Sequence, residues 1–208
     1  MLYSKKYNLL FVAVPKTGTT SFTSALGAML DAERNLVCVD GADIRCGEHD
    51  SLAGIIDRVG WNRVKDMTIV GAVRNPWDRL VSSYHFYRNG RVVSRILRGE
   101  QRKLMAILNV IAAKVLPFSL WIRFYRTKTC YSYLKDQSGE LRVDHLLHLE
   151  TFKEDVAKLS KVLSLPSVEL PEHNKSLRTH YRDYYSVRTQ RLVAKKFAED
   201  VTAFDYSF

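Results

Sequence analysis

The sequence predicts an α/β fold in which a mostly parallel central sheet is flanked by helices. Two short apolar runs, residues 9–14 and 68–73, have the length of buried strands, and each ends at a polar loop containing proline. The first loop leads into a segment with helical spacing of its apolar residues, 21–31, and the second into a helix expected from Pro76 or Trp77 to Tyr87. This repeat of strand, polar loop and helix is typical of a parallel sheet.

The rest of the chain continues the alternation. We expect two more strands, at 35–39 and 142–149, and three more helices, at 51–60, 151–163 and 187–204. The apolar stretch 104–115 and the aromatic segment 118–125 are too short and too interrupted to span a membrane. They are expected to form either a core or lid helix, or an interfacial surface that touches lipid or a lipid-linked acceptor.

The length and composition are those of a folded protein with a basic surface. The 208 residues suit one domain, 1–208, and 46% hydrophobic with 26% charged residues is the balance of a soluble globular protein. Lysine and arginine exceed aspartate and glutamate by 32 to 22, which makes a net charge of +10. This charge favours anionic partners, namely nucleotides, acidic glycans, nucleic acid or anionic lipid, although solubility alone can also account for it.

The cysteines and the first residues argue against several protein classes. Cys38, Cys46 and Cys130 are odd in number and lack CxxC spacing, which argues against a disulfide framework and against a zinc site. An export signal consists of a basic start, a long apolar stretch and a cleavage site, in that order. The first residues of the chain do not show this pattern, so no export signal is visible. We therefore expect a cytoplasmic protein, with peripheral attachment to a membrane as an option.

The first candidate binding segment, VPKTGTTS at residues 14–21, lies between the first expected strand and its helix. Backbone N–H groups and the dipole at a helix N-terminus favour a bound phosphate or sulfate. Gly18 allows close approach of the backbone, Lys16 supplies positive charge, and the hydroxyls that follow are hydrogen-bond donors. The glycine count and the lysine position do not match GxxxxGK[ST], which disfavours a Walker-type NTPase. The expected nucleotide-binding residues here are Lys16, Thr17, Gly18, Thr19, Thr20 and Ser21.

The second segment, RNPWDRLVSSY at residues 74–84, also lies between an expected strand and a helix. Arg74 offers a bidentate guanidinium and Ser82 a hydroxyl, and the two side chains could converge on one phosphate. Two anion sites at adjacent strand ends suit a ligand that carries phosphates at both ends of a nucleoside. Either segment alone would be a weak indication of such a ligand, and the two segments together are a much more specific one.

Together the two segments resemble the nucleotide-binding motifs of sulfotransferases that use 3′-phosphoadenosine 5′-phosphosulfate (PAPS), most of all the carbohydrate (Golgi-type, family 2) branch and its bacterial relatives. Four further segments look similar to that branch: 47–51, 143–152 with Glu150, 170–176 and 184–208. The resemblance implies a P-loop-like three-layer domain and an enzyme that transfers a sulfuryl group from PAPS to a hydroxyl of a carbohydrate or glycolipid. Adenosine 3′,5′-bisphosphate would be the product, and no metal would be required. Many eukaryotic members carry an N-terminal membrane anchor, which is not expected here.

The resemblance and the chemistry of transfer assign roles to individual residues. Lys16 is expected to stabilise the charge that builds up on the leaving phosphate oxygen. His49 is the first choice for the general base that takes the proton of the acceptor hydroxyl, with Glu48 in reserve and Asp43 a weaker option. By resemblance, Lys175 and Ser176 would close over the nucleotide. We expect His148 and Glu150 to have structural roles.

Two other functions remain open from the residues alone. A P-loop-like nucleotide-dependent kinase is disfavoured, because the glycine spacing is wrong and the expected strand 68–73 ends at Arg74 instead of an aspartate. A non-catalytic basic binder of acidic glycan or nucleic acid would use the basic segments 88–102 and 175–191. Such a binder has no need for two phosphate loops, and no nucleic-acid partner is expected.

Overall fold

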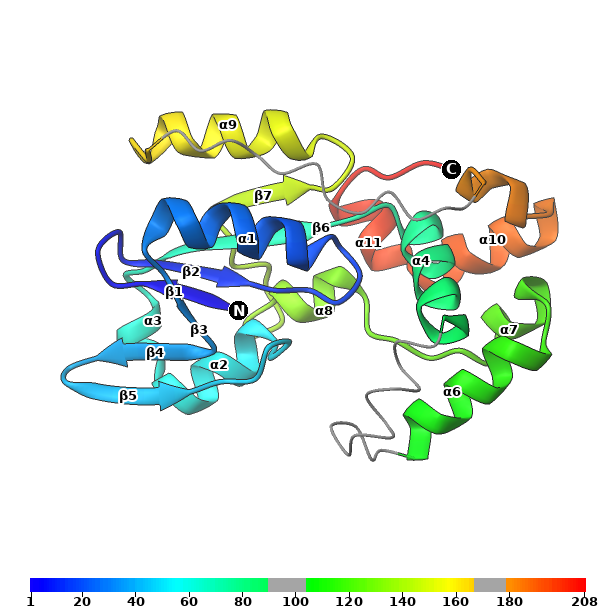
Figure 1. Cartoon of the computed structure of the whole chain (residues 1–208), viewed down its shortest axis with the longest axis horizontal. Coiled ribbons are helices and arrows are strands. Elements are labelled where there is room, and N and C mark those ends of the chain that lie inside the picture. The colour runs from blue at the N-terminus through cyan, green and yellow to red at the C-terminus, as the bar shows by residue number, and fades with distance from the viewer. Residues whose placement is uncertain (90–103, 167–178) are drawn as a thin grey trace. The chain divides into compact units, whose positions relative to one another are not determined.

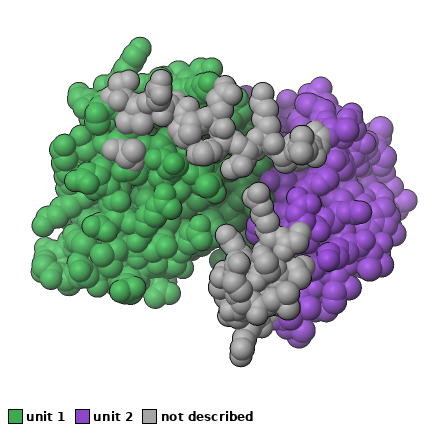
Figure 2. Space-filling model, in the orientation of Figure 1, with its two compact units in different colours: residues 1–74, 128–176 green, residues 75–127, 177–208 purple. Residues whose placement is uncertain are grey.

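The computed structural model describes residues 1–89, 104–166 and 179–208 (Figure 1). The chain divides into two compact units (Figure 2): unit 1 comprises residues 1–74 and 128–176, and unit 2 comprises residues 75–127 and 177–208. Each unit is described by itself, and the expectation of a single domain stays a prediction. Among the described residues, no helix has both the length and the apolar composition needed to cross a bilayer.

Unit 1 is built on a five-stranded sheet with the order β3-β1-β2-β6-β7. Its strands are β1 (Leu2–Ser4), β2 (Leu9–Val12), β3 (Glu33–Arg34), β6 (Thr68–Val73) and β7 (His145–His148). β2, β6 and β7 are parallel, whereas β1 is antiparallel to both of its neighbours, β2 and β3. The sheet is therefore partly parallel instead of mostly parallel. Since β2, β6 and β7 point the same way, the loops that follow them leave the same edge of the sheet.

Helices cover both faces of this sheet. α1 (Thr19–Leu30) and α9 (Phe152–Val162) cover one face, where Phe22, Leu26 and Leu159 share a buried cluster with Phe11 and Leu147. On the opposite face α8 (Cys130–Leu134) packs against β6, and a Cβ atom added to Gly71 would lie 2.7 Å from the Leu134 side chain. α2 (Leu52–Val59) and α3 (Trp61–Val64) complete the described helices of unit 1, and α2 also contacts α8.

Unit 2 is helical, with an aromatic core. Its described elements are α4 (Pro76–Arg88), α6 (Leu104–Val115), α7 (Phe118–Phe124), the 3₁₀ helix η1 (Tyr181–Tyr184), α10 (Val187–Lys196) and α11 (Ala198–Ala203). Trp77, Tyr84, Trp121 and Phe197 are buried together in this core. The guanidinium of Arg79 lies 3.8 Å from the carboxylate of Asp200, and both side chains are almost fully buried.

Most expected elements are confirmed, and the structure differs from the expectations at four places. The expected helix 187–204 is two helices, because Phe197 (φ −117°, ψ 34°) interrupts it between α10 and α11. The expected strand 35–39 is β4 (Leu36–Val39), which pairs only with β5 (Ala42–Arg45) in a separate two-stranded sheet. β1 precedes the strand that was expected to be first, and β7 covers only the middle of the expected strand 142–149.

Candidate active site

The β2–α1 loop is held by its own threonines. The hydroxyls of Thr17 and Thr19 both donate to the carbonyl oxygen of Val14, at 2.9 and 2.7 Å. These hydroxyl hydrogens are therefore used inside the loop. Thr20 is exposed at the loop surface and Ser21 is largely buried. Phosphate binding by any of these hydroxyls stays a prediction, and Thr20 needs the least rearrangement for it.

Lys16 has an unusual backbone conformation. Its φ is 67°, in the left-handed region that non-glycine residues rarely occupy, and adopting it costs about 1–2 kcal/mol. The guanidinium of Arg74, which follows β6, donates from Nη1 to the Lys16 carbonyl oxygen at 3.0 Å. Arg74 is only 8% exposed, so this hydrogen bond is sheltered from water. Within unit 1, the contact joins Arg74, the first residue of the second predicted segment, to the first segment.

The N-terminus of α1 has the properties of an anion site. Gly18 is the N-cap (φ 78°, ψ 23°), it provides no side-chain cap, and the first turn of the helix contains no acidic residue. The amides of Ser21 and Phe22 already donate to the Gly18 carbonyl oxygen, at 2.9 and 3.1 Å, so the amides of Thr19 and Thr20 are the ones offered to an anion. A Cβ atom at position 18 would clash with a methyl group of Leu149, so both the φ angle and this contact favour glycine.

His49 is fastened to the same loop. Its Nδ1 atom lies 2.8 Å from the carbonyl oxygen of Ala13, the residue that follows β2. A carbonyl oxygen only accepts hydrogen bonds, so Nδ1 must carry the hydrogen. In the neutral ring this leaves the lone pair on Nε2. The side chain is 38% exposed, which leaves the ring accessible to another molecule.

Neither alternative base has an equivalent anchor. Glu48 is well exposed, with its Oε1 atom 4.0 Å from Nε2 of His49. Asp43 lies on β5, where its carboxylate accepts a hydrogen bond from the Cys38 thiol and thereby raises the pKa of that thiol. The choice among these three residues stays a prediction, and the contact of His49 with the loop favours the histidine.

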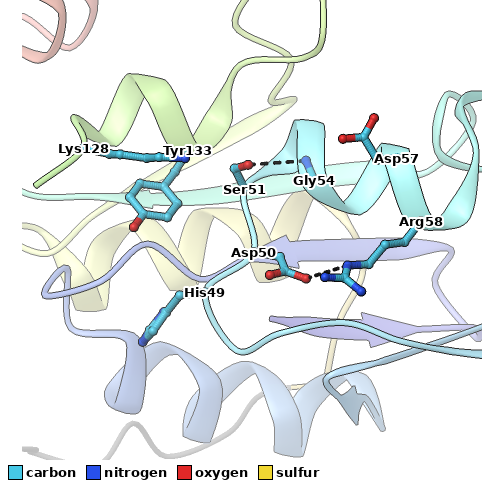
Figure 3. A pocket seen from close by; sticks show the side chains of 8 residues that line it. All are labelled: His49, Asp50, Ser51, Gly54, Asp57, Arg58, Lys128 and Tyr133. Carbon is cyan, nitrogen blue, oxygen red and sulfur yellow. Dashed lines mark hydrogen bonds and ion pairs between the residues drawn. The ribbon is translucent and has the colours of Figure 1, made fainter. Parts of the chain in front are cut away.

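A cavity of about 380 Å³ opens beside His49, and every residue that lines it belongs to unit 1 (Figure 3). In that view His49, Lys128 and Tyr133 stand at one end, and Asp57 and Arg58 at the other. The remaining lining residues are Asp50, Ser51 and Gly54. Arg58 pairs with Asp50 at 3.2 Å, and Ser51 caps α2 by accepting from the amide of Gly54 at 3.3 Å. The walls are therefore rich in hydrogen-bonding groups.

Sequence reasoning missed part of this cavity. Lys128 and Tyr133 lie far from both binding segments along the chain and belong to no recognisable motif. They reach the cavity because α8 packs against α2. A ring contact between the two, with the Lys128 ammonium 5.9 Å from the centre of the Tyr133 ring, holds them together at one end.

Other predicted residues are placed as follows. Ser82 lies partly buried on α4 in unit 2, and its convergence with Arg74 on one phosphate stays a prediction. Lys175 and Ser176 lie outside the described residues. The ring of His148 contacts Asp155 at 3.0 Å, in keeping with its expected structural role, whereas that of Glu150 stays a prediction. Within residues 1–89, 104–166 and 179–208, no cluster of three or more His, Cys, Asp or Glu side chains could hold a metal ion.

The comparison with protein families agrees with this geometry. A model described as the sulfotransferase family matches residues 1–207, nearly the entire chain. The searches of curated proteins and of solved structures gave no match. Because the family model covers far more than half of the sequence, the chain belongs to the sulfotransferase family, in its family 2 branch.

Proposed function

We propose that this sulfotransferase moves a sulfuryl group from PAPS to a hydroxyl group of a carbohydrate or glycolipid. The observation that carries the proposal is the attachment of two side chains, those of Arg74 and His49, to backbone carbonyls of one loop of unit 1. Arg74 donates to the carbonyl of Lys16, and His49 is bonded to the carbonyl of Ala13, three residues earlier. A cation, an anion-binding helix end and an exposed imidazole therefore share one edge of the sheet.

The residues present suit the donor. The uncapped amides of α1 and the Lys16 ammonium would bind the 5′-phosphosulfate, and Arg74 would bind the 3′-phosphate, with Ser82 as its proposed partner. PAPS supplies the sulfuryl group and leaves as adenosine 3′,5′-bisphosphate. Lys16 would offset the negative charge that grows on the departing phosphate oxygen, which is the largest single contribution in reactions of this kind.

His49 would move the proton. Its Nδ1–H is held by the Ala13 carbonyl, so the ring is oriented and Nε2 can accept the hydrogen of an acceptor hydroxyl. The imidazolium that results keeps its Nδ1–H bond to that carbonyl. This arrangement needs no change of tautomer during the proton transfer.

The cavity beside His49 would receive the acceptor. Its volume falls within the usual range of about 300–1,000 Å³ for ligand sites. Carboxylates, a guanidinium, an ammonium and hydroxyls line it, and these groups match the many hydroxyls of a sugar better than an apolar acceptor. The proposed acceptor is therefore a carbohydrate, either free or as the head group of a glycolipid.

Nucleotide binding gives the first test. Calorimetry should show that the full chain binds adenosine 3′,5′-bisphosphate more tightly than AMP or ATP, because only the former carries both phosphates. Arg74→Ala should reduce this preference by weakening the bisphosphate most, and loss of its hydrogen bond to the Lys16 carbonyl should weaken all three nucleotides to a smaller extent. Equal affinity for all three nucleotides would contradict the two-phosphate proposal, and a preference for ATP would favour the kinase alternative.

Sulfate transfer gives the second test. With radiolabelled PAPS and a panel of glycans and lipid extracts, Lys16→Ala and His49→Ala should each lose activity by about 10²–10³-fold while the fold is kept. Glu48→Gln is the matched control, since it removes the neighbouring carboxylate without touching the imidazole, and it should remain active. Normal turnover of His49→Ala would assign the base to Glu48 or to another residue.

A further inference from the structure

Helix α6 of unit 2 exposes apolar side chains where a surface helix normally carries polar ones. Leu104, Leu108, Ile111 and Val115 follow a 4-3-4 spacing, which places them along one side of the helix and defines the α6 stripe. All four are exposed, with Leu104 at 67% and Val115 at 74%. The buried residues of α6, Val110 and Ala113, lie on the other side of the helix, and Ala113 packs in the aromatic core. α6 is therefore apolar on both sides.

Helix α7 adds to this exposed apolar surface. Phe124, its last residue, is 70% exposed, and Leu120, one turn earlier, is 40% exposed. α7 contacts α6, and Figure 1 shows the two helices as neighbours. An exposed phenylalanine and an exposed aliphatic stripe on two contacting helices are costly in water, so such a surface is expected to have a partner.

The charges beside these side chains have one sign. The unit 2 residues from 104 to 127 include Lys114, Arg123 and Arg126, all exposed, and no aspartate or glutamate. Apolar side chains flanked by basic residues are the pattern of a helix that lies in the interface of an anionic bilayer. The cations would meet lipid phosphates while the apolar side chains enter the acyl boundary.

A second copy of the chain fits this surface less well. Twelve residues of α6 span about 18 Å, and a stripe of that length and about 10 Å width offers about 180 Å², far below the roughly 800 Å² per partner of a stable interface. Symmetric pairing of two such surfaces would also bring like charges together. Binding to an anionic bilayer requires no minimum interface area and brings no like charges together. Each inserted side chain adds its own contribution to the free energy of binding.

We infer that α6 and the exposed end of α7 attach this protein peripherally to an anionic membrane surface. The α6 stripe and Phe124 would enter the interface, and Lys114, Arg123 and Arg126 would lie at the level of the head groups. The attachment concerns unit 2 alone and does not depend on the identity of the sulfate acceptor.

Vesicle sedimentation of the full chain tests this inference without any activity measurement. The protein should sediment with vesicles of phosphatidylcholine and phosphatidylglycerol, and much less with phosphatidylcholine alone. The double variant Leu108→Ser/Ile111→Ser should lower the partition coefficient at least about tenfold, which is less than the loss of two fully inserted side chains. Lys114→Gln should lower binding to the anionic vesicles alone, by about fivefold.

Val162→Ser is the matched control, because Val162 lies on α9 of unit 1 and is 66% exposed. It should bind vesicles as the wild type does. Thermal unfolding checks the fold of each variant, and Val115→Ser replaces the double variant if that one does not fold. Failure of the wild type to sediment with either vesicle overturns the inference, as does unchanged binding of the α6 variants. A wild-type dimer that the double variant makes monomeric, without a change in lipid binding, would assign the surface to a second copy.

Discussion

Replacing Lys16 with glycine is expected to stabilise unit 1 while it abolishes sulfate transfer. The φ of 67° at Lys16 places an L-residue in the left-handed region, and the Arg74 guanidinium holds its carbonyl there. Glycine adopts this conformation without steric cost, and its carbonyl can still accept from Arg74. The ammonium group, however, would be lost. The backbone strain and the proposed catalytic charge therefore belong to the same residue.

The expected magnitude follows from two opposing effects. Relief of the left-handed conformation gains about 1–2 kcal/mol. The greater freedom of glycine in the unfolded chain takes back about 0.4–1 kcal/mol. The difference is a gain of about 0–1.6 kcal/mol, centred near 0.8 kcal/mol, or about 2 °C in Tm for a chain of this length. The rate of sulfate transfer should fall by about 10²–10³-fold.

Lys16→Ala is the matched control for this experiment. Alanine keeps the left-handed strain and removes the same charge, so its Tm should stay near that of the wild type while its activity falls as far as that of Lys16→Gly. Scanning calorimetry and the transfer assay read the two properties separately. If Lys16→Ala raises the Tm as much as Lys16→Gly does, removal of the charge is responsible instead of the backbone. A lower Tm for Lys16→Gly would refute the strain argument.

Two further predictions concern Gly18 of the same loop and Asp155, which holds the end of β7. Gly18→Ala should destabilise the protein by about 1–3 kcal/mol in denaturant unfolding, through φ 78° and the contact with Leu149, and adding Leu149→Ala should recover only the contact share. Burial raises the pKa of Asp155, but hydrogen bonds from the amide and ring of His148 outweigh it, so the pKa lies below its usual value. Asp155→Asn should therefore cost about 1.5–3 kcal/mol at pH 7. That difference should shrink as the pH falls from about 4 through the lowered pKa, whereas a constant difference would show that the charge is not involved.

Local patterns predicted most secondary structure well. The strand at 68–73 and the helix at 51–60 depend on run length, apolar spacing and a capping serine or glycine, all of which act within a few residues. β1 was not predicted, because a strand of three residues is too short to show an alternation of apolar and polar side chains. The break between α10 and α11 at Phe197 was not predicted, because the spacing of the apolar residues on both sides fits one continuous helix.

The candidate site was predictable in part. The loop at 14–21, Arg74 and His49 each stood out by residue type and position after an expected strand. The cavity residues Lys128 and Tyr133 did not, because nothing near them in the chain resembles a binding motif. The use of the Thr17 and Thr19 hydroxyls inside the loop was also invisible, since a threonine donates to a phosphate and to a carbonyl with equal ease.

By itself the sequence determined the strand–loop–helix units and the family to which the chain belongs, and it predicted anion binding at the β2–α1 loop. Only the tertiary structure decided that Arg74 holds Lys16, 58 residues away, and that the His49 ring meets Ala13, 36 residues away. Such contacts depend on the register of β2 against β6 and on how the segment before α2 returns to the sheet. They are set by the packing of distant segments, which no local pattern of residues encodes.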